Sequence, residues 1–175
     1  MKLIKKLFFL TIIILLSINN LKAEDKVAYL DIDFIITNSL AGKLLLTNLQ
    51  KQEEVKISEF KINDEKFLND EKKILAKKNL VSNEEIKKEM NALQIKFQEY
   101  KNNKKKEIEN LKKKRKKNII NFINLINPII EKYMADNSIY ILMDKKNVFI
   151  ANNNYDITKK LIELIDNQIK TVKIE

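Results

Sequence analysis

The sequence predicts an α+β protein in which a small β-sheet or barrel body forms an oligomer and carries a long antiparallel helical hairpin. Residues 43–136 contain no glycine and a single proline, and such an unbroken run of strong helix formers indicates very long helices. Apolar residues in this stretch recur at steps of three and four, which is the period of a coiled-coil seam. Short apolar runs rich in β-branched and aromatic residues flank the stretch at both ends and predict strands.

The N-terminal part of the body is predicted over residues 24–43. A strand at residues 27–32 joins apolar, β-branched and aromatic side chains, and Asp31 or Asp33 is placed to cap a short helix after it. The only glycine of the chain, Gly42, lies in the segment 39–43. We interpret that segment as the joint between the body and the arm.

The arm is predicted over residues 44–133, with its tip near residues 79–82. Ser82 and Glu85 form a capping-box pattern, which predicts the start of the returning helix. An outgoing helix of about 35 residues, at 1.5 Å per residue, makes an arm roughly 50 Å long. Asp64 and Glu71 occupy seam positions, and we expect them to weaken the coiled-coil packing locally.

Apolar and aromatic residues of the seam are candidates for contact with a bound protein. They either pack between the two helices or touch a partner, and the periodicity leaves both interpretations open. The candidates are Phe60, Phe67, Ile74, Met90, Phe97 and Tyr100.

The returning helix carries a dense run of lysines over residues 101–117. In a hairpin folded near residue 81, Glu53 and Glu54 lie beside this run and neutralise only part of it. The run is either a solvated helix face or a basic surface that meets acidic or lipidic partners. The lysines that we single out for partner binding are Lys104, Lys105, Lys112, Lys113 and Lys116.

The body resumes at residues 134–175, after Pro128, which predicts a bend late in the returning helix. Strands at residues 139–143 and 148–151 are predicted to form a hairpin. A terminal amphipathic helix at residues 157–169 follows, with Asp156 as its cap.

The predicted body is too small to bury its own apolar residues. The strand at residues 139–143 is apolar on both faces and therefore predicts burial, while three strands and a helix make a poor core. We expect a homo-oligomer whose strands form a shared sheet or barrel. The candidate interface residues are Val27, Tyr29, Ile139, Ile141, Met143, Val148 and Ile150.

Residues 1–23 have the layout of a secretory signal peptide. Lysines precede an apolar run of about ten residues, which is too short for an ordinary membrane span, and Ala23 before Glu24 is a fair cleavage site. We expect a soluble mature chain outside the cytoplasm; the alternative is an uncleaved anchor. The formal charge is +10, and the four lysines of this segment account for four of it.

The composition argues against an enzyme. The chain has no cysteine and no histidine, so it lacks thiolate ligands, disulfides and the commonest general base and metal ligand. It also has no glycine-rich phosphate loop. We expect no catalytic residue, no metal and no cofactor.

The two ends of the mature chain carry specific motifs: Val-Ala-Tyr-Leu-Asp at 27–31 with Ser-Leu-Ala-Gly-Lys at 39–43, and Ile-Leu-Met-Asp-Lys-Lys-Asn-Val-Phe-Ile-Ala at 141–151 with Tyr-Asp-Ile-Thr at 155–158. In these motifs the mature chain resembles the Skp/OmpH family of periplasmic chaperones. The charged hairpin between them looks like the tentacle of that family. One departure is the position of the lysines, which here crowd the lower half of the returning arm rather than the tip.

The resemblance implies a homotrimer with a small β-barrel body and three tentacles around a cavity. Such a protein would hold unfolded outer-membrane proteins, without ATP, in the periplasm of a Gram-negative-type envelope. Anionic lipid or lipopolysaccharide is a further expected partner, and no specific nucleic acid is expected. The alternatives are an envelope coiled coil that binds polyanions or acidic lipid through its basic helix, and a purely structural coiled coil.

Overall fold

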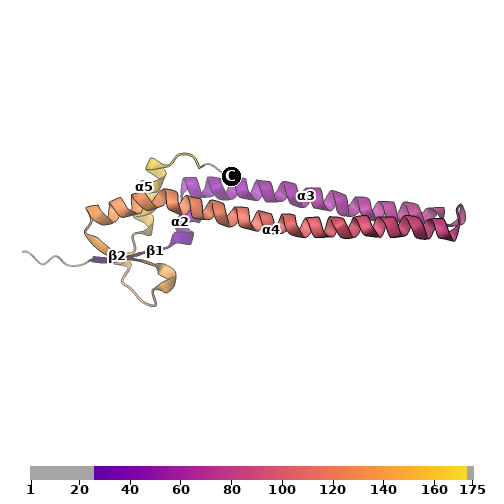
Figure 1. Ribbon diagram of the computed structural model, residues 1–175. Helices are drawn as coiled ribbons and strands as arrows, with labels where there is room; N and C mark the ends of the chain where they lie inside the picture. Colours follow the sequence, from indigo (N-terminus) through magenta and orange to yellow (C-terminus); the bar gives the residue numbers. More distant parts are fainter. Residues whose placement is uncertain (1–25, 173–175) are drawn as a thin grey trace, which may run out of the picture.

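A computed structural model describes residues 26–172 as a mostly helical molecule with a small body and one long arm (Figure 1). The predicted signal segment at residues 1–23 lies outside the described residues. The long helices and the small sheet agree with the predicted α+β class. The elements in chain order are β1 (Lys26–Leu30), α2 (Ile32–Asn38), α3 (Leu40–Ala76), the 3₁₀ turn η2 (Lys77–Asn79), α4 (Asn83–Asp136), β2 (Ile139–Asp144), the 3₁₀ turns η3 (Lys145–Asn147) and η4 (Asn153–Tyr155), and α5 (Thr158–Gln168).

The joint between α2 and α3 is made by Ser39 and Gly42. Ser39 ends α2 and caps α3, and its buried hydroxyl accepts a hydrogen bond from the Gly42 N–H at 3.1 Å. A Cβ atom on Gly42 would lie 2.1 Å from the carbonyl oxygen of Ile36. The chain therefore needs its one glycine here because α2 and α3 approach each other at backbone contact.

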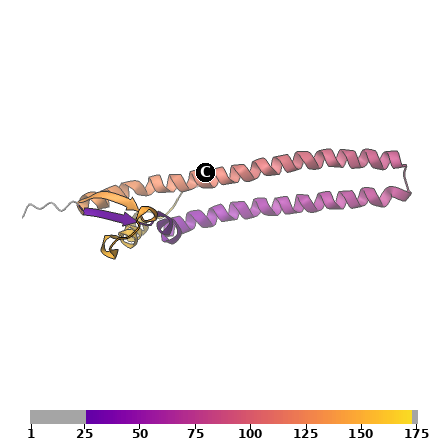
Figure 2. The same ribbon diagram turned by 90° about the horizontal axis from the view of Figure 1, so that it is seen from below.

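α3 and α4 form the arm and lie side by side in both views (Figures 1 and 2). They contain 37 and 54 residues, which correspond to helices of about 55 and 80 Å. Lys77 binds Glu89 near their connection, whereas Arg115 binds Glu53 far from it. Residues early in α3 thus face residues late in α4.

The start of α4 follows the predicted capping pattern. The Ser82 hydroxyl accepts a hydrogen bond from the Glu85 N–H at 3.2 Å, directly after the turn that follows α3. Further along, Pro128 lies inside α4 on its exposed side, and the helix continues beyond it to Asp136.

The sheet consists of β1 and β2, paired in parallel, with Val27 opposite Ile141 and Tyr29 opposite Met143. Figure 2 shows the two arrows side by side. Parallel neighbours need a long crossover connection. Here the crossover is α2, α3 and α4, so the whole arm is an insertion between two paired strands.

The predicted third strand at 148–151, and the hairpin it would make with 139–143, are wrong for the single chain. After β2 the chain turns through η3, where the Asp144 carboxylate accepts a hydrogen bond from the Lys146 N–H at 3.0 Å. Lys146 then pairs with Asp33 at 2.5 Å and Lys145 with Asp156 at 3.5 Å. These contacts place Lys146 next to Asp33 of α2 and Lys145 next to Asp156, just before α5.

The hydrophobic core lies at the base of the arm, where α2, α3, α4 and α5 meet. It extends along both long helices past the predicted boundaries at residues 43 and 134, because it includes Leu49 of α3 and Phe122 of α4. The fully buried apolar side chains are Ile35, Leu45, Phe122, Ile126, Leu161 and Ile165.

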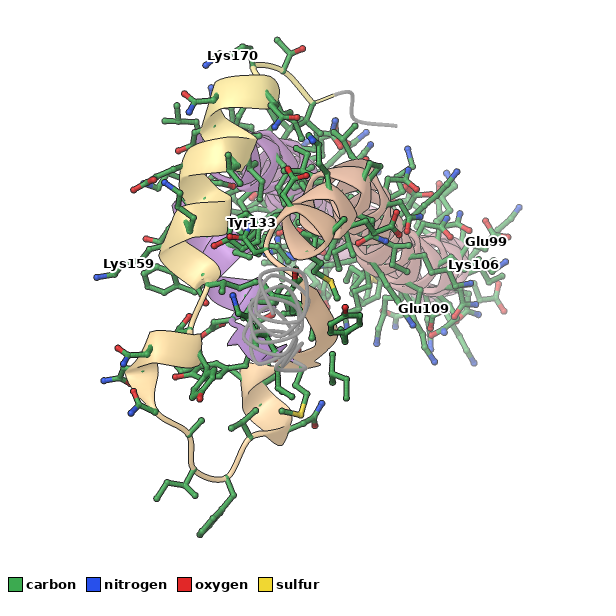
Figure 3. All side chains as sticks on the ribbon, turned by 90° about the vertical axis from the view of Figure 1, so that its left-hand side faces the viewer. Glu99, Lys106, Glu109, Tyr133, Lys159 and Lys170 are labelled. Carbon is green, nitrogen blue, oxygen red and sulfur yellow. The ribbon has the colours of Figure 1, made fainter. Side chains whose placement is uncertain are left out.

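α5 closes the base of the arm and holds the start of α3. Tyr133 lies between α4 and α5, while Lys159 lies on the outer side of α5 (Figure 3). The Asp166 carboxylate accepts a hydrogen bond from the N–H of Leu40, the first residue of α3, at 2.7 Å. The N-cap of α5 is Ile157, and the predicted cap Asp156 lies one residue before it, where its carboxylate accepts a hydrogen bond from the Thr158 N–H at 3.0 Å.

Candidate binding surface

Three aromatic rings fill the middle of the arm between the helices. The ring centroid of Phe67, on α3, lies 5.1 Å from those of both Phe97 and Tyr100 on α4. Phe97 and Tyr100 are three residues apart and so project from one side of α4. The cluster keeps the two helices in contact in the part of the arm where the neighbouring seam positions, Asp64 and Glu71, are polar.

Beside this cluster a salt bridge joins the two helices. The Lys104 ammonium lies 2.6 Å from the Asp64 carboxylate and 5.4 Å from the centroid of the Phe60 ring. The Tyr100 hydroxyl donates a hydrogen bond to the Phe60 carbonyl at 2.9 Å. Asp64, which interrupts the apolar seam, is therefore matched by a cation from the opposite helix.

The same contacts shift the pKa values of the three titratable groups. The hydrogen bond from Lys104 holds the pKa of Asp64 below its ordinary value. The hydrogen bond to Asp64 raises the pKa of Lys104. Burial, followed by the neighbouring Asp64 carboxylate, raises the pKa of Tyr100. At neutral pH the lysine and the aspartate are both charged.

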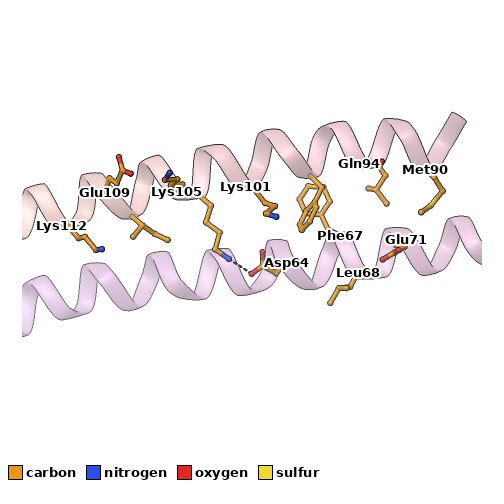
Figure 4. Close-up of a pocket in the computed structure, with 14 residues that line it drawn as sticks. Asp64, Phe67, Leu68, Glu71, Met90, Gln94, Lys101, Lys105, Glu109 and Lys112 are labelled. Atoms are coloured by element: carbon orange, nitrogen blue, oxygen red, sulfur yellow. Dashed lines mark hydrogen bonds and ion pairs between the residues drawn. The ribbon is translucent and has the colours of Figure 1, made fainter. Parts of the chain in front are cut away.

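A groove runs along one side of the arm between α3 and α4, and we call it the arm groove. It has two sections, of about 940 Å³ and 490 Å³, which share Asp64, Lys104, Ile108 and Lys112. In the larger section, Phe67 and Leu68 come from α3, and Met90 and Lys101 point across from α4 (Figure 4). The other apolar side chains of the groove are Ile57, Phe60, Leu93, Phe97, Ile108 and Leu111.

Most predicted seam candidates pack between the helices. Phe60, Phe67, Met90 and Tyr100 are partly buried there, and Ile74 is buried near the tip. Phe97 is 38% exposed. All of them except Ile74 and Tyr100 also line the arm groove, so packing and surface contact are compatible for these residues.

Sequence reasoning missed Leu68 as a site residue. It is 56% exposed and lines the larger section of the groove. Leu68 directly follows the seam residue Phe67, so it lies about 100° around the helix from it. An apolar residue next to a seam position is the signal that would have identified it.

The lysines of α4 divide into two groups. Lys104, Lys105 and Lys112 line the arm groove, whereas Lys113 and Lys116 are exposed and line neither of its sections. On the outside of the arm, Glu99, Lys106 and Glu109 project away from the helices (Figure 3). Within residues 26–172, neither Lys112 nor Lys113 nor Lys116 forms an ion pair.

The candidate interface residues of the body are unevenly exposed. Ile141 is 54% exposed, so the predicted burial of the strand at 139–143 does not occur within one chain. Val27, Met143 and Ile150 are also exposed, and Ile139 and Val148 are partly buried. Tyr29 differs from them, because it is buried inside its own chain. Two further exposed aromatic residues, Tyr140 and Phe149, were missed.

Two kinds of site are absent from residues 26–172. No group of acidic side chains there is arranged to hold a metal ion. No helix in the same range combines the length and hydropathy that a membrane span requires.

The fold and its surfaces define a class of protein: a small body of helices and a two-stranded sheet that carries a basic, grooved helical hairpin. The chain belongs to the OmpH-like outer membrane protein family, whose sequence profile matches residues 26–165. Its fold is similar to the crystal structure of a Caulobacter crescentus protein that was proposed to be an OmpH-like outer membrane chaperone. The two share 20% sequence identity and a TM-score of 0.77, over 85% of this chain and 88% of that one. No curated protein matches the sequence at a significant level.

Proposed function

We propose that this protein is an ATP-independent holdase chaperone, which captures unfolded outer-membrane proteins and prevents their aggregation. The family membership and the chaperone description of the Caulobacter crescentus protein support this function. The observation that carries it is the surface of the arm, where exposed apolar residues such as Leu68 line the same groove as lysines such as Lys101 and Lys112, which have no ion pair among the described residues.

This surface suits an unfolded membrane-barrel protein because it offers two non-specific attractions. Such a client exposes alternate apolar residues, whose burial against the arm is favourable without any recognition of sequence. Acidic segments of the client are attracted by the basic face of α4 from a distance. The arm carries no catalytic group in this account, and release needs only that each contact is weak.

We also propose that three chains associate through their bodies, so that three arms surround a cavity. The exposed apolar residues of the body support an oligomer: Ile141, Phe149 and Ile150 are 54%, 102% and 85% exposed. β2 pairs with β1 alone among the described strands, which leaves one of its edges unpaired. The segment 148–151 would become a strand only when a neighbouring chain supplies its partner.

The proposed place of action is the periplasm. The signal-like segment at residues 1–23 supports export, with cleavage near Ala23. The intact mass of the protein recovered from the cell envelope tests this: a chain that retains Met1 contradicts it.

A second candidate function is binding of anionic lipid headgroups or other polyanions. The specific observation in its favour is that Lys113 and Lys116 are exposed, lie outside the arm groove and form no ion pair within the described residues. A row of such lysines attracts any polyanion, with a strong dependence on salt.

One experiment separates the two functions. An outer-membrane barrel protein unfolded in urea is diluted into buffer at two salt concentrations, and its aggregation is followed by light scattering. We expect the wild-type protein to suppress aggregation at both. Charge reversal of Lys112, Lys113 and Lys116 to glutamate should slow capture, mainly at low salt, because exposed charges are screened within about 10 Å at 0.1 M. If the wild-type protein binds anionic vesicles but leaves aggregation unchanged, the chaperone function is excluded.

A further inference from the structure

We infer that the arm groove of each single chain is a binding site for one extended client segment, of about the length of one membrane-spanning β-strand. This inference rests on the proposed holdase function and deepens it. The proposed cavity between arms would enclose a client without defined contacts, whereas the groove between α3 and α4 would hold a defined stretch of it.

The length of the groove matches such a segment. Its two sections together are lined from Met90 to Lys112 on α4 and from Glu53 to Glu71 on α3. At 1.5 Å per residue the α4 side is about 33 Å long. An extended chain rises about 3.3 Å per residue, so about ten residues fill the groove. A membrane-spanning strand of a barrel has about 9–11 residues.

The surface of the groove suits alternating side chains. Leu68 and Ile108 are 56% and 38% exposed, on opposite helices, and present apolar surface to one side of a bound strand. The other side of that strand would face water. The volume of about 940 Å³ lies at the upper end of the range for ligand pockets, which fits one layer of side chains rather than a folded domain.

The charge of the groove favours acidic residues in the bound segment. Lys104 is neutralised by Asp64 and Glu53 by Arg115, and these four groups add no net charge. The lining groups that form no ion pair within residues 26–172 are Lys61, Lys101, Lys105, Lys112, Glu71 and Glu109. Four of these six groups are lysines and two are glutamates, so the groove keeps a net positive charge. An extended segment with apolar residues alternating with polar and acidic ones complements both features.

The binding test uses the full protein and labelled synthetic peptides, with fluorescence anisotropy as the readout. The probe is a ten-residue peptide in which leucine or valine alternates with serine or aspartate. We expect affinity to rise from five to ten residues and to level off at fifteen, because the groove is then full. Replacing the aspartates by asparagines should weaken binding at low salt.

Matched variants locate the site. The double variant Leu68→Ser with Ile108→Ser should bind the ten-residue peptide roughly tenfold more weakly, through the loss of two apolar contacts. The control is Ile62→Ser with Ile95→Ser. These residues are 63% and 62% exposed on the same two helices and line neither section of the groove. The control variant loses similar apolar surface and a similar amount of helix propensity, but outside the groove. Its affinity for the peptide should therefore equal that of the wild-type protein. Equal losses in the two variants would overturn the inference.

Photo-crosslinking identifies the occupant in the intact protein. A benzophenone amino acid at position 68 should form adducts with an unfolded barrel protein, and one at position 62 should not. Adducts at 68 with a second copy of this chain, or with lipid in vesicles and not with the client, would overturn the inference. If the wild-type protein suppresses aggregation while position 68 forms no client adduct, the proposed groove site is refuted but the proposed holdase function is supported. If peptides bind in the groove but the protein does not reduce aggregation, the proposed holdase function is refuted but the proposed groove site is supported.

Discussion

At the scale of single residues, Gly42 shows how one position determines the geometry of the arm. A Cβ atom there would lie 2.1 Å from the Ile36 carbonyl oxygen, and that oxygen belongs to the backbone of α2. The obstacle cannot rotate away as the end of a side chain would, so α2 and α3 must separate. That separation would also disturb the buried Ser39 cap, on which the first turn of α3 depends.

We therefore expect Gly42→Ala to destabilise the body, although alanine is the better helix former. Overpacking of this kind costs roughly 1–3 kcal/mol of unfolding free energy, which exceeds the stabilisation from the higher helix propensity of alanine. The urea midpoint of unfolding measures the change. Lys43→Ala is the matched control, because Lys43 is exposed in the same turn and should leave the midpoint unchanged. A Gly42→Ala midpoint at or above the wild-type value would contradict the account of the joint.

At the scale of elements, the arm is a long hairpin whose seam alternates between apolar layers and polar ones. Asp64 would be a defect in an apolar seam, yet Lys104 reaches it from α4 at 2.6 Å and covers the Phe60 ring. The pair links the helices at the point where the two sections of the arm groove meet. It therefore contributes to the spacing of α3 and α4 without closing the groove.

This link makes the arm sensitive to acid. The pKa of Asp64 is lowered in the folded arm, so its stabilising contribution is present above the ordinary carboxyl pKa of about 4 and is lost as the pH falls through the lowered value. The pKa of Lys104 is raised, so its contribution is lost only as the pH rises through a value above about 10.4. The pair is intact throughout the physiological range.

NMR titration of the Asp64 carboxyl carbon tests the pair. We expect a pKa below the ordinary value in the wild-type protein, and a return toward that value in Lys104→Met. Lys101→Met is the control, because Lys101 contacts the Phe97 ring at 5.5 Å and forms no ion pair with Asp64. An Asp64 pKa that is the same in wild type and Lys104→Met would show that the salt bridge does not form in solution.

Local signals explain which elements could be predicted from the sequence. The capping pattern at Ser82 and Glu85 acts over one helical turn, and the structure shows its hydrogen bond where the pattern placed it. The seam aromatics were predicted for the same reason, since their spacing follows from the helix period alone. Leu68 was missed because it stands one residue beside that period.

Long-range contacts explain what could not be predicted. Val27 pairs with Ile141 across more than a hundred residues, and no local pattern reveals that this pairing is parallel. The segment 148–151 has the composition of a strand, yet the sheet of the described residues contains only β1 and β2, and the segment pairs with neither. Tyr29 is an aromatic strand residue, which suggested an interface, but it is buried within its own chain. Its carbonyl accepts a hydrogen bond from the Ile157 N–H, just before α5.

At the scale of the whole molecule, the body of a single chain leaves much apolar surface in water. Its exposed side chains include Tyr140 and Ile141 on β2 and Phe149 in the segment that follows β2. A body this small, which carries an arm of about 50 Å, gains stability when it buries that apolar surface against other copies of the chain. The proposed trimer therefore joins at the body and leaves the arms free.

Ile141→Asp tests this division. Because Ile141 is 54% exposed in one chain, the variant chain should still fold. A lone charge in a shared apolar interface costs several kcal/mol, so the oligomer should dissociate into helical monomers. Sedimentation equilibrium with circular dichroism measures both properties. Ile62→Asp, at a site that is 63% exposed on the arm, should remain oligomeric. A wild-type protein that sediments as a monomer would refute the shared body.

The central claim is that the arm, and not the body, captures unfolded proteins. Glu53 and Arg115 lie 3.2 Å apart across the hairpin, so residues 54–114 can be replaced there by a short turn. This change retains the apolar core at the base, including Leu49 and Phe122. The measurement is light scattering by an outer-membrane barrel protein diluted from urea, with full-length or arm-shortened protein of equal oligomeric state. We predict that only the full-length protein suppresses aggregation; equal suppression by the arm-shortened protein would contradict the claim.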